Sequence, residues 1–289
     1  MNAPLIPGCR EWMHAARDGA NLFVRCSDTA AVSGGKPRGT ILLTHGMGEH
    51  SGRYYHVIRQ LNATGVRVVA WDLRGHGHSE GARGDVRHYD VLVDDLLEIW
   101  NLPETQGAGG PVYLYGHSLG GQITLNFTVR HRPQAAGLII TSPWLRLAFR
   151  PPLWKVALAH LTARVWPRFT QDTELSPTRL SRDLEFLMAM PDQNLVHHRM
   201  SARMYRALTA GATRAEHEAA RLSYPILLVH GSRDPVTCVT ATEEFYRALK
   251  SRDKSLIIVP EALHETHNDL CREAVLSQIT AWLDARLPV

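Results

Sequence analysis

The pentapeptide Gly116-His117-Ser118-Leu119-Gly120 places a hydroxyl nucleophile in a particular setting. The apolar run 111–115 before it predicts a buried strand, and residues 121–130 after it carry apolar side chains at helical spacing. A strand, a sharp turn and a helix are what a nucleophile elbow requires, because the turn holds the serine hydroxyl above the sheet. We therefore expect Ser118 to be a catalytic nucleophile. The alternative is a glycine-rich turn that closes a strand–helix unit and does no chemistry.

A serine hydroxyl is a weak nucleophile near neutral pH, so it needs a base and an acid that orients this base. After an elbow serine, the acid and then a histidine should follow along the chain. The acid candidate is Asp234, directly after the apolar run 225–231, although an aspartate that caps the next helix is the alternative. The base candidate is His264, in the loop after the last predicted strand, with His267 as the alternative. We expect His267, nearer the terminal helix, to be a surface or capping residue.

The negative charge that develops on an attacked carbonyl needs hydrogen-bond donors already in place. One donor is expected to be the backbone N–H of Leu119, the residue after the nucleophile. The second should come from the loop after the predicted strand 40–44, where His45-Gly46-Met47-Gly48 lets the backbone turn its amides inward. This arrangement points to Met47, and the alternative is one more glycine turn.

Buried strands are predicted at six continuous apolar runs, residues 40–44, 66–71, 111–115, 137–142, 225–231 and 255–260. Helical patterns alternate with them at 55–64, 89–101, 121–130, 240–250 and 269–287, and a peripheral hairpin is expected within 11–26. This alternation is typical of an α/β fold with a mostly parallel sheet covered by helices on both faces. Reactive groups gather at the carboxyl ends of such strands, and the candidate residues all follow strands.

The alternation of strands and helices stops after residue 142. From there no buried strand is evident in the sequence, and prolines interrupt helical stretches. We expect three parts: a first core part at 1–142, a helical cap inserted at 143–222 and a second core part at 223–289. The position of the cap in the chain would lay it over the Ser118 end of the sheet as a lid.

The cap is also where substrate contacts are expected. Its apolar candidates for an acyl channel are Trp144, Leu147, Phe149 and Trp154. Residues 144–169 contain basic but no acidic side chains, so the outer face of the cap is a candidate for contact with an anionic lipid surface. The alternative is an ordinary amphipathic helical pair that packs on the core with solvated arginines.

Composition narrows the class of protein. A chain of 289 residues fits one sizeable domain, or one domain with an insertion, and its net charge of +4 is mild. No Lys/Arg cluster is interleaved with aromatic residues, so nucleic acid is not an expected partner. The four cysteines form no CxxC pair and are expected to be free thiols. With no signal peptide or apolar run of membrane-spanning length, we expect a cytoplasmic protein.

Three motifs carry a resemblance to the α/β-hydrolase superfamily. Within it, the chain resembles the monoacylglycerol lipase and lysophospholipase-like branch, the serine aminopeptidase-type hydrolases. The run from His45 to Tyr54 is similar to the oxyanion motif of that branch. The run from Asp72 to Gly81 matches its second signature, and the run from Gly116 to Gly121 matches its elbow. The resemblance covers nearly the whole chain and is weakest in the cap.

The resemblance implies a catalytic triad of Ser118, Asp234 and His264, with oxyanion amides at Met47 and Leu119. It implies a serine carboxylester hydrolase acting on monoacylglycerol, lysophospholipid or similar short- to medium-chain acyl esters, with no metal and no organic cofactor. In one departure, Glu261-Ala262 stands where this branch usually has a glycine near the histidine.

Other interpretations stay open. A ligand-binding member of the fold could keep the triad with little turnover, and a peptidase or thioesterase would share the triad geometry. The spacing of His264 and His267 could suggest a metal pair, but no third ligand stands nearby in the sequence. His76 and His78 are expected to be structural or surface residues, and His197-His198 a solvated helix face.

Overall fold

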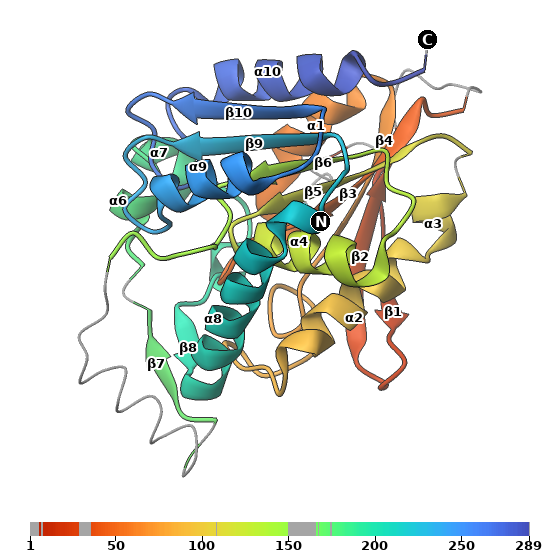
Figure 1. The fold of residues 1–289 in the computed structure, drawn as a ribbon. Helices are drawn as coiled ribbons and strands as arrows, with labels where there is room; N and C mark the ends of the chain where they lie inside the picture. Colours follow the sequence, from red (N-terminus) through yellow and green to blue (C-terminus); the bar gives the residue numbers. More distant parts are fainter. Residues whose placement is uncertain are drawn as a thin grey trace.

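The computed structural model describes residues 6, 8–28, 36–107, 109–149, 166, 168–173 and 175–288. Its centre is an eight-stranded sheet in the order β1-β2-β4-β3-β5-β6-β9-β10 (Figure 1). β1 pairs antiparallel with β2 and β2 with β4, and all other pairs in this sheet are parallel. The strands are β1 Arg10–Ala15, β2 Asn21–Ser27, β3 Gly39–Thr44, β4 Val66–Trp71, β5 Val112–His117, β6 Gly137–Thr141, β9 Ile226–Gly231 and β10 Lys254–Val259.

Alternate residues of the central strands pack on opposite faces of the sheet. In β3, Ile41 and Leu43 belong to the core on one face, whereas Leu42 belongs to the core on the other. Each face is covered by helices, so these strands are buried on both sides and read as continuous apolar runs. Helices α1 (Tyr55–Asn62) and α10 (Arg272–Asp284) cover the first face, and α2 (Tyr89–Trp100), α4 (Leu119–His131), α8 (Ala202–His217) and α9 (Val239–Ala248) cover the second (Figure 1).

The predicted α/β architecture is confirmed. The six predicted strands form β3, β4, β5, β6, β9 and β10, and the five predicted helices form α1, α2, α4, α9 and α10. The predicted hairpin forms β1 and β2 at the edge of the main sheet. Two short helices, η1 (Ser51–Tyr54) and α3 (Pro103–Gln106), lie in the loops of the core.

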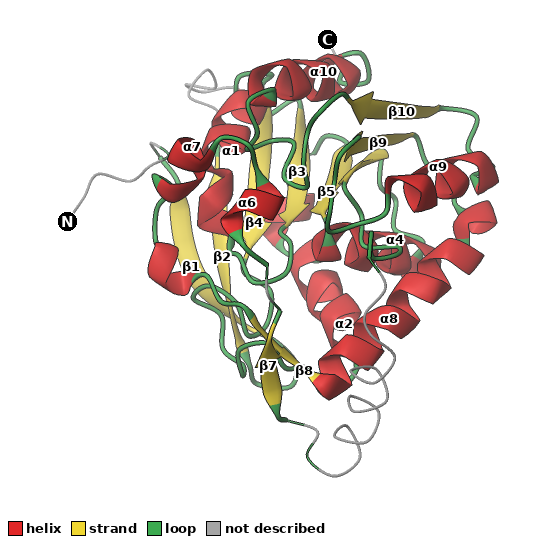
Figure 2. Cartoon of the chain, turned by 90° about the vertical axis from the view of Figure 1, so that its left-hand side faces the viewer, coloured by secondary structure: helices red, strands yellow, loops and turns green. Residues whose placement is uncertain are grey.

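Between β6 and β9 the chain leaves the sheet, and we call residues 143–222 the insertion. Its two described strands pair with each other, antiparallel and apart from the main sheet, and its described part lies toward the carboxyl ends of β9 and β10 (Figures 1 and 2). The described elements of the insertion are β7 Thr170–Asp172, α6 Pro177–Leu180, α7 Leu184–Met188, η2 Gln193–Leu195, β8 Arg199–Ser201, α8 and η3 Ala219–Arg221.

The long helix α8 packs against the core helices α2 and α4. Nδ2 of Asn126 on α4 donates to the carbonyl oxygen of Gly211 at 3.0 Å. A Cβ at Gly211 would come within 2.4 Å of the ring of Tyr89 on α2, so only glycine permits this approach. Met204 and Leu208 of α8 belong to the same apolar core as α2 and α4. Helix α8 of the insertion is therefore part of the packed core.

Two predictions from composition concern the cysteines and membrane-spanning segments. All four cysteines are free thiols, as their spacing predicts. Burial raises the pKa of Cys26 to about 11, so this thiol is a poor nucleophile. No helix in the described ranges is both long and apolar enough to cross a membrane.

Candidate active site

Ser118 stands on the sharp turn between β5 and α4. Its backbone has φ 52° and ψ −114°, a conformation that costs free energy for a residue with a Cβ. The flanking glycines make the turn possible: a Cβ at Gly120 would lie 2.2 Å from the carbonyl oxygen of Thr44, and one at Gly116 would lie 2.7 Å from Cα of Gly121. The geometry is that of a nucleophile elbow, with the hydroxyl at the carboxyl end of the sheet.

The structure brings Ser118, Asp234 and His264 together from the loops after β5, β9 and β10. Nδ1 of His264 lies 2.7 Å from Oδ2 of Asp234, and Nε2 of His264 lies 2.9 Å from Oγ of Ser118. Because a carboxylate can only accept, the proton of the neutral ring is on Nδ1, and Nε2 is left to accept from the serine hydroxyl. All three residues are buried. This is the arrangement in which a histidine can take the proton of a serine.

Both carboxylate oxygens of Asp234 are held by several donors. Oδ1 accepts from the backbone N–H groups of Val236 at 2.7 Å and Thr237 at 3.0 Å. Oδ2 accepts from the Thr237 hydroxyl at 2.8 Å and lies 3.1 Å from Nε2 of His230, in addition to its contact with His264. Thr237 and His230 were not expected at the site, although Thr237 follows Asp234 by three residues in the same loop and His230 precedes it by four, at the end of β9.

The electrostatics favour a proton on His264. Burial alone would raise the pKa of Asp234, but the charge of His264 and hydrogen bonds from His230 and His264 outweigh it and hold this pKa below its usual range. Burial alone would lower the pKa of His264, but Asp234 outweighs it and raises this pKa. His117, with its ring centroid 5.0 Å from that of His264, has its pKa lowered to about 3 by burial. A proton taken from Ser118 can therefore rest on His264 and not on His117.

The two predicted oxyanion donors belong to the elbow turn and to the loop after β3. Leu119 begins α4, and the first N–H groups of a helix have no partner within the helix. Met47 lies in the loop after β3 and lines the same cavity as Ser118. In the described part of the chain, the N–H of Met47 makes no backbone hydrogen bond. Both amides are thus available to a ligand oxygen.

A buried charge cluster ties the loop of Met47 to the loop of His264. Oε1 of Glu49 accepts from the N–H of Gly46 at 2.6 Å and from the hydroxyl of Tyr54 at 2.7 Å. Arg53 donates to Oε2 of Glu49 at 2.9 Å and binds both carboxylate oxygens of Glu265, at 3.1 and 2.8 Å. Glu265 is the residue after His264, so this cluster fixes two parts of the site relative to each other.

The cluster is buried and pairs two carboxylates with one guanidinium, and the pKa values of the two carboxylates shift in opposite directions. Burial raises the pKa of Glu49 to about 7, against the attraction of Arg53. For Glu265, burial opposes the charged form, but Arg53 and its hydrogen bonds outweigh it and lower the pKa. This cluster was not predicted, although the spacing of Glu49 and Arg53 at i and i+4 in the loop after β3 is a pattern that indicates an ion pair.

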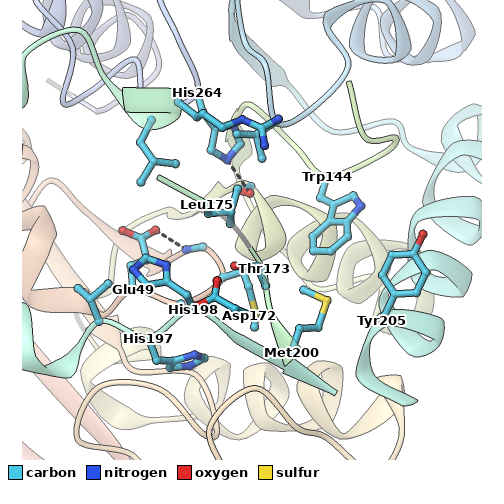
Figure 3. A pocket seen from close by; sticks show the side chains of 18 of the residues that line it. Glu49, Trp144, Asp172, Thr173, Leu175, His197, His198, Met200, Tyr205 and His264 are labelled. Atoms are coloured by element: carbon cyan, nitrogen blue, oxygen red, sulfur yellow. Dashed lines mark hydrogen bonds between the residues drawn. The ribbon is translucent and has the colours of Figure 1, made fainter. Parts of the chain in front are cut away.

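A cavity of about 450 Å³ opens over Ser118 and His264. Figure 3 shows Trp144, Met200 and Tyr205 on one side of it and Glu49, His197 and His198 on the other. Further apolar lining residues are Leu147, Phe149, Phe169, Leu175 and Val236. Of the four predicted acyl-channel residues, Trp144, Leu147 and Phe149 therefore line the cavity, and Trp154 lies outside the described residues.

Two expectations about histidines are wrong. His267 is not a surface residue: it is fully buried, stacks on Tyr54 with ring centroids 4.9 Å apart, and meets the ring of His117 edge-on at 4.7 Å. His197 and His198 do not lie on a helix. They follow η2 in extended chain and line the cavity, and the N–H of His197 donates to the carbonyl oxygen of Gly48 at 2.9 Å. In both cases contacts with residues distant in sequence decide the burial.

The remaining expectations concern His76, His78 and the loop before His264. His76 is buried and its ring contacts that of His197, with centroids 4.7 Å apart, whereas His78 is exposed. Glu261, where the resemblance leads one to expect a glycine, has φ 61°, a conformation that favours glycine. Its N–H donates to Oγ of Ser232 at 2.9 Å, which holds this strained position in front of His264. Among the described residues, no group of three or more His, Cys, Asp or Glu side chains is placed to hold a metal ion.

Comparisons with known proteins agree with this fold. The sequence model of the family described as serine aminopeptidase, S33, matches residues 35–271. A monoacylglycerol lipase of Mycolicibacterium smegmatis is 30% identical over 252 residues, which cover 87% of this chain and 90% of that protein. An uncharacterised abhydrolase domain-containing protein of Dictyostelium discoideum is 33% identical over 256 residues, which cover 87% of this chain but 27% of that protein.

A solved structure extends the agreement to three dimensions. The crystal structure of Paleococcus ferrophilus monoacylglycerol lipase matches with a TM-score of 0.81 at 30% identity, covering 92% of this chain and 99% of that one. Together with the parallel sheet and its helices on both faces, this confirms the α/β-hydrolase fold. The chain belongs to the serine aminopeptidase S33 family of α/β-hydrolases.

Proposed function

We propose that this protein is a serine carboxylester hydrolase that cleaves monoacylglycerol, lysophospholipid or similar short- to medium-chain acyl esters through an acyl-enzyme. The observation that carries the proposal is the line of contacts from Asp234 through His264 to Ser118, at 2.7 and 2.9 Å, beneath a largely apolar cavity. Relatives named monoacylglycerol lipase support the choice of ester.

In the acylation step, Nε2 of His264 takes the hydroxyl proton as Oγ of Ser118 bonds to the ester carbonyl carbon. The backbone N–H groups of Met47 and Leu119 hydrogen-bond the oxygen that becomes negative. The carbonyl carbon then loses the alcohol oxygen, which receives the proton from His264. In deacylation, His264 takes a proton from water, the hydroxide attacks the acyl carbon, and the proton returns to Oγ of Ser118 as the fatty acid leaves.

Asp234 keeps the proton of the neutral imidazole on Nδ1 and stabilises the positive ring that forms in each step. The raised pKa of His264 fits this role, since a base that holds the proton of the serine needs a nearby negative charge. His117 is not a competing base because burial lowers its pKa to about 3.

The two sides of the cavity suit the two parts of an acyl ester. The side formed by Trp144, Met200 and Tyr205 is apolar and suits an acyl chain, and the side formed by His197 and His198 suits a polar alcohol. Trp166, at 65% exposure, and Phe169, which lines the cavity, are exposed aromatic residues of the insertion, which supports a contact between the insertion and a lipid surface.

We further propose the division into a core of 1–142 and 223–289 with a cap at 143–222. The lining of the cavity by residues of both parts supports it, with α8 as the part of the cap that packs into the core. We also propose a cytoplasmic location, which the free state of all four cysteines supports.

The function can be tested by covalent labelling together with kinetics. A serine-directed phosphonate should add to Ser118, as located by mass spectrometry, and Ser118→Ala should abolish both the adduct and ester cleavage. Rates on monoacylglycerols, lysophospholipids and p-nitrophenyl esters of graded chain length would identify the preferred ester. The absence of an adduct on Ser118 would indicate a ligand-binding protein. Faster turnover of peptides or thioesters than of any oxygen ester would contradict the proposed substrate class.

A further inference from the structure

His230 stands at the carboxyl end of β9 and is fully buried against the acid of the site. Its Nε2 lies 3.1 Å from Oδ2 of Asp234 and 3.2 Å from the carbonyl oxygen of Thr237. Both neighbours accept hydrogen bonds, so Nε2 must carry a proton. Nδ1 lies 2.8 Å from the hydroxyl of Thr242 on α9, which can donate to it. The ring thus bridges α9 and the catalytic acid with its donor directed at the acid.

Asp234 does not depend on His230 for its position. Its Oδ1 is held by the two N–H groups of Val236 and Thr237, and its Oδ2 by the Thr237 hydroxyl. What His230 adds is a third donor to Oδ2, the same oxygen that lies 2.7 Å from Nδ1 of His264. A donor on a carboxylate oxygen reduces the negative potential that this oxygen presents to its other partners.

We propose that His230 is a positioning residue that acts through Asp234: its Nε2–H shares the carboxylate oxygen that orients His264 and so limits how tightly His264 holds a proton. The proposal rests on the proposed function, because it assigns a role within that reaction. A base in ester hydrolysis must take a proton from Ser118 and then release it to the leaving alcohol, so a base that is too strong slows the second transfer.

Other groups also face His264, and they stay the same when His230 is replaced. The ring of His117 lies 5.0 Å from that of His264, and Glu265 and Glu49 act on His264 through their charges. Thr237 also approaches Nδ1 of His264, at 3.3 Å. A change in the titration of His264 after a substitution at 230 would therefore report on the shared oxygen of Asp234.

The test uses two variants that differ in one donor. His230→Leu has similar bulk without a donor, and His230→Gln has an amide N–H that can reach Oδ2. His264 must be neutral to accept a proton, so kcat/KM falls on the acid side as pH drops through its pKa. Without the donor, Asp234 favours the protonated ring more strongly, so the acid limb of His230→Leu should move to higher pH by about half a unit or more. His230→Gln should return it toward the wild-type position.

An NMR titration gives a second readout that does not depend on how much of each variant folds into active enzyme. The Nδ1–H of His264 can be followed by NMR as a low-field proton, and its titration should move upward in His230→Leu. Thr242→Val, which leaves His230 in place but removes its partner on α9, should give a smaller upward shift. An acid limb that is unchanged or moves to lower pH in His230→Leu, or a Gln variant that behaves like the Leu variant, would overturn the proposal. Wild-type protein without esterase activity would instead overturn the proposed function.

Discussion

The backbone N–H of His197 donates to the carbonyl oxygen of Gly48 across 2.9 Å, so the insertion is bonded directly to the loop that carries Met47. Gly48 has φ 77°, and a Cβ built on it would lie 2.3 Å from the carbonyl oxygen of His197. The insertion and this loop thus approach too closely at this point to leave room for a side chain at position 48. The position of the Met47 amide therefore depends on both segments.

Gly48→Ala should lower kcat by roughly 10²- to 10³-fold, as expected when one oxyanion donor is lost, with a much smaller change in KM. The methyl group would push the Met47 loop away from His197 and move the Met47 amide out of place. Steady-state kinetics on the best ester would measure the effect. Gly19→Ala is the matched control, because Gly19 also has a positive φ, 86°, but has nothing within 4 Å of its Cβ position. Equal losses in both variants would point to backbone strain alone.

Asp234→Asn should reduce kcat by about 10⁴-fold while the protein stays folded. The amide would donate where the carboxylate accepts, which would place the proton of the His264 ring on Nε2 and leave Ser118 without a base. Thermal unfolding would check the fold and ester kinetics the activity. A variant that retains a tenth of the wild-type rate would argue against Asp234 as the acid of the triad.

Glu49 should make the protein less stable as the pH rises from 4.5 toward about 7. Its pKa is raised in the folded state, so the folded protein binds more protons than the unfolded chain in this window, and the free energy of unfolding falls with increasing pH. Glu49→Gln should flatten this part of the stability profile, measured by urea unfolding at a series of pH values.

Glu273→Gln, at an exposed position on α10, is the control and should leave the profile of the wild type unchanged. Glu265 acts at lower pH. Because its pKa is lowered in the folded state, the stability that it contributes is present above the usual pKa of a glutamate and is lost as the pH falls below that value. If Glu49→Gln kept the wild-type slope between pH 4.5 and 7, the buried cluster would not be the source of the proton uptake.

Met200→Trp should shift the preference of the enzyme toward shorter acyl chains. Met200 lies on the apolar side of the cavity with Trp144 and Tyr205 (Figure 3), and a larger ring there would fill space that long chains need. The ratio of kcat/KM values for long and short p-nitrophenyl esters should fall by about 10-fold or more. Met188→Trp, at a residue that is 59% exposed and does not line the cavity, should leave this ratio unchanged.

The parts of this protein that could be predicted from sequence are those set by local pattern and chain order. The strands could be predicted because burial on both faces makes each one a continuous apolar run. The nucleophile Ser118 could be predicted because the turn that holds it requires the glycines on either side. Asp234 and His264 were reached from their order along the chain, directly after predicted strands, and the structure brings both to Ser118.

The remaining features depend on contacts between distant segments. His267 is buried because Tyr54 and His117 pack on its ring, and His197 lines the cavity because its backbone meets Gly48. His230 stands only four residues before Asp234, but its contacts with Asp234 and with Thr242 of α9 depend on how the chain turns after β9. No local pattern of residue types encodes the burial of His267 or the approach of His197 to Gly48, so both were expected at the surface.

The packing of α8 has a consequence for engineering by exchange of caps between relatives. Asn126 of α4 is bonded to the backbone of Gly211, and Tyr89 fills the space that a side chain at 211 would need. A chimera that replaced all of 143–222 would remove this helix and uncover the apolar surfaces of α2 and α4. A transplanted lid should therefore join the host before Ala202, so that α8 stays with the scaffold on which it packs.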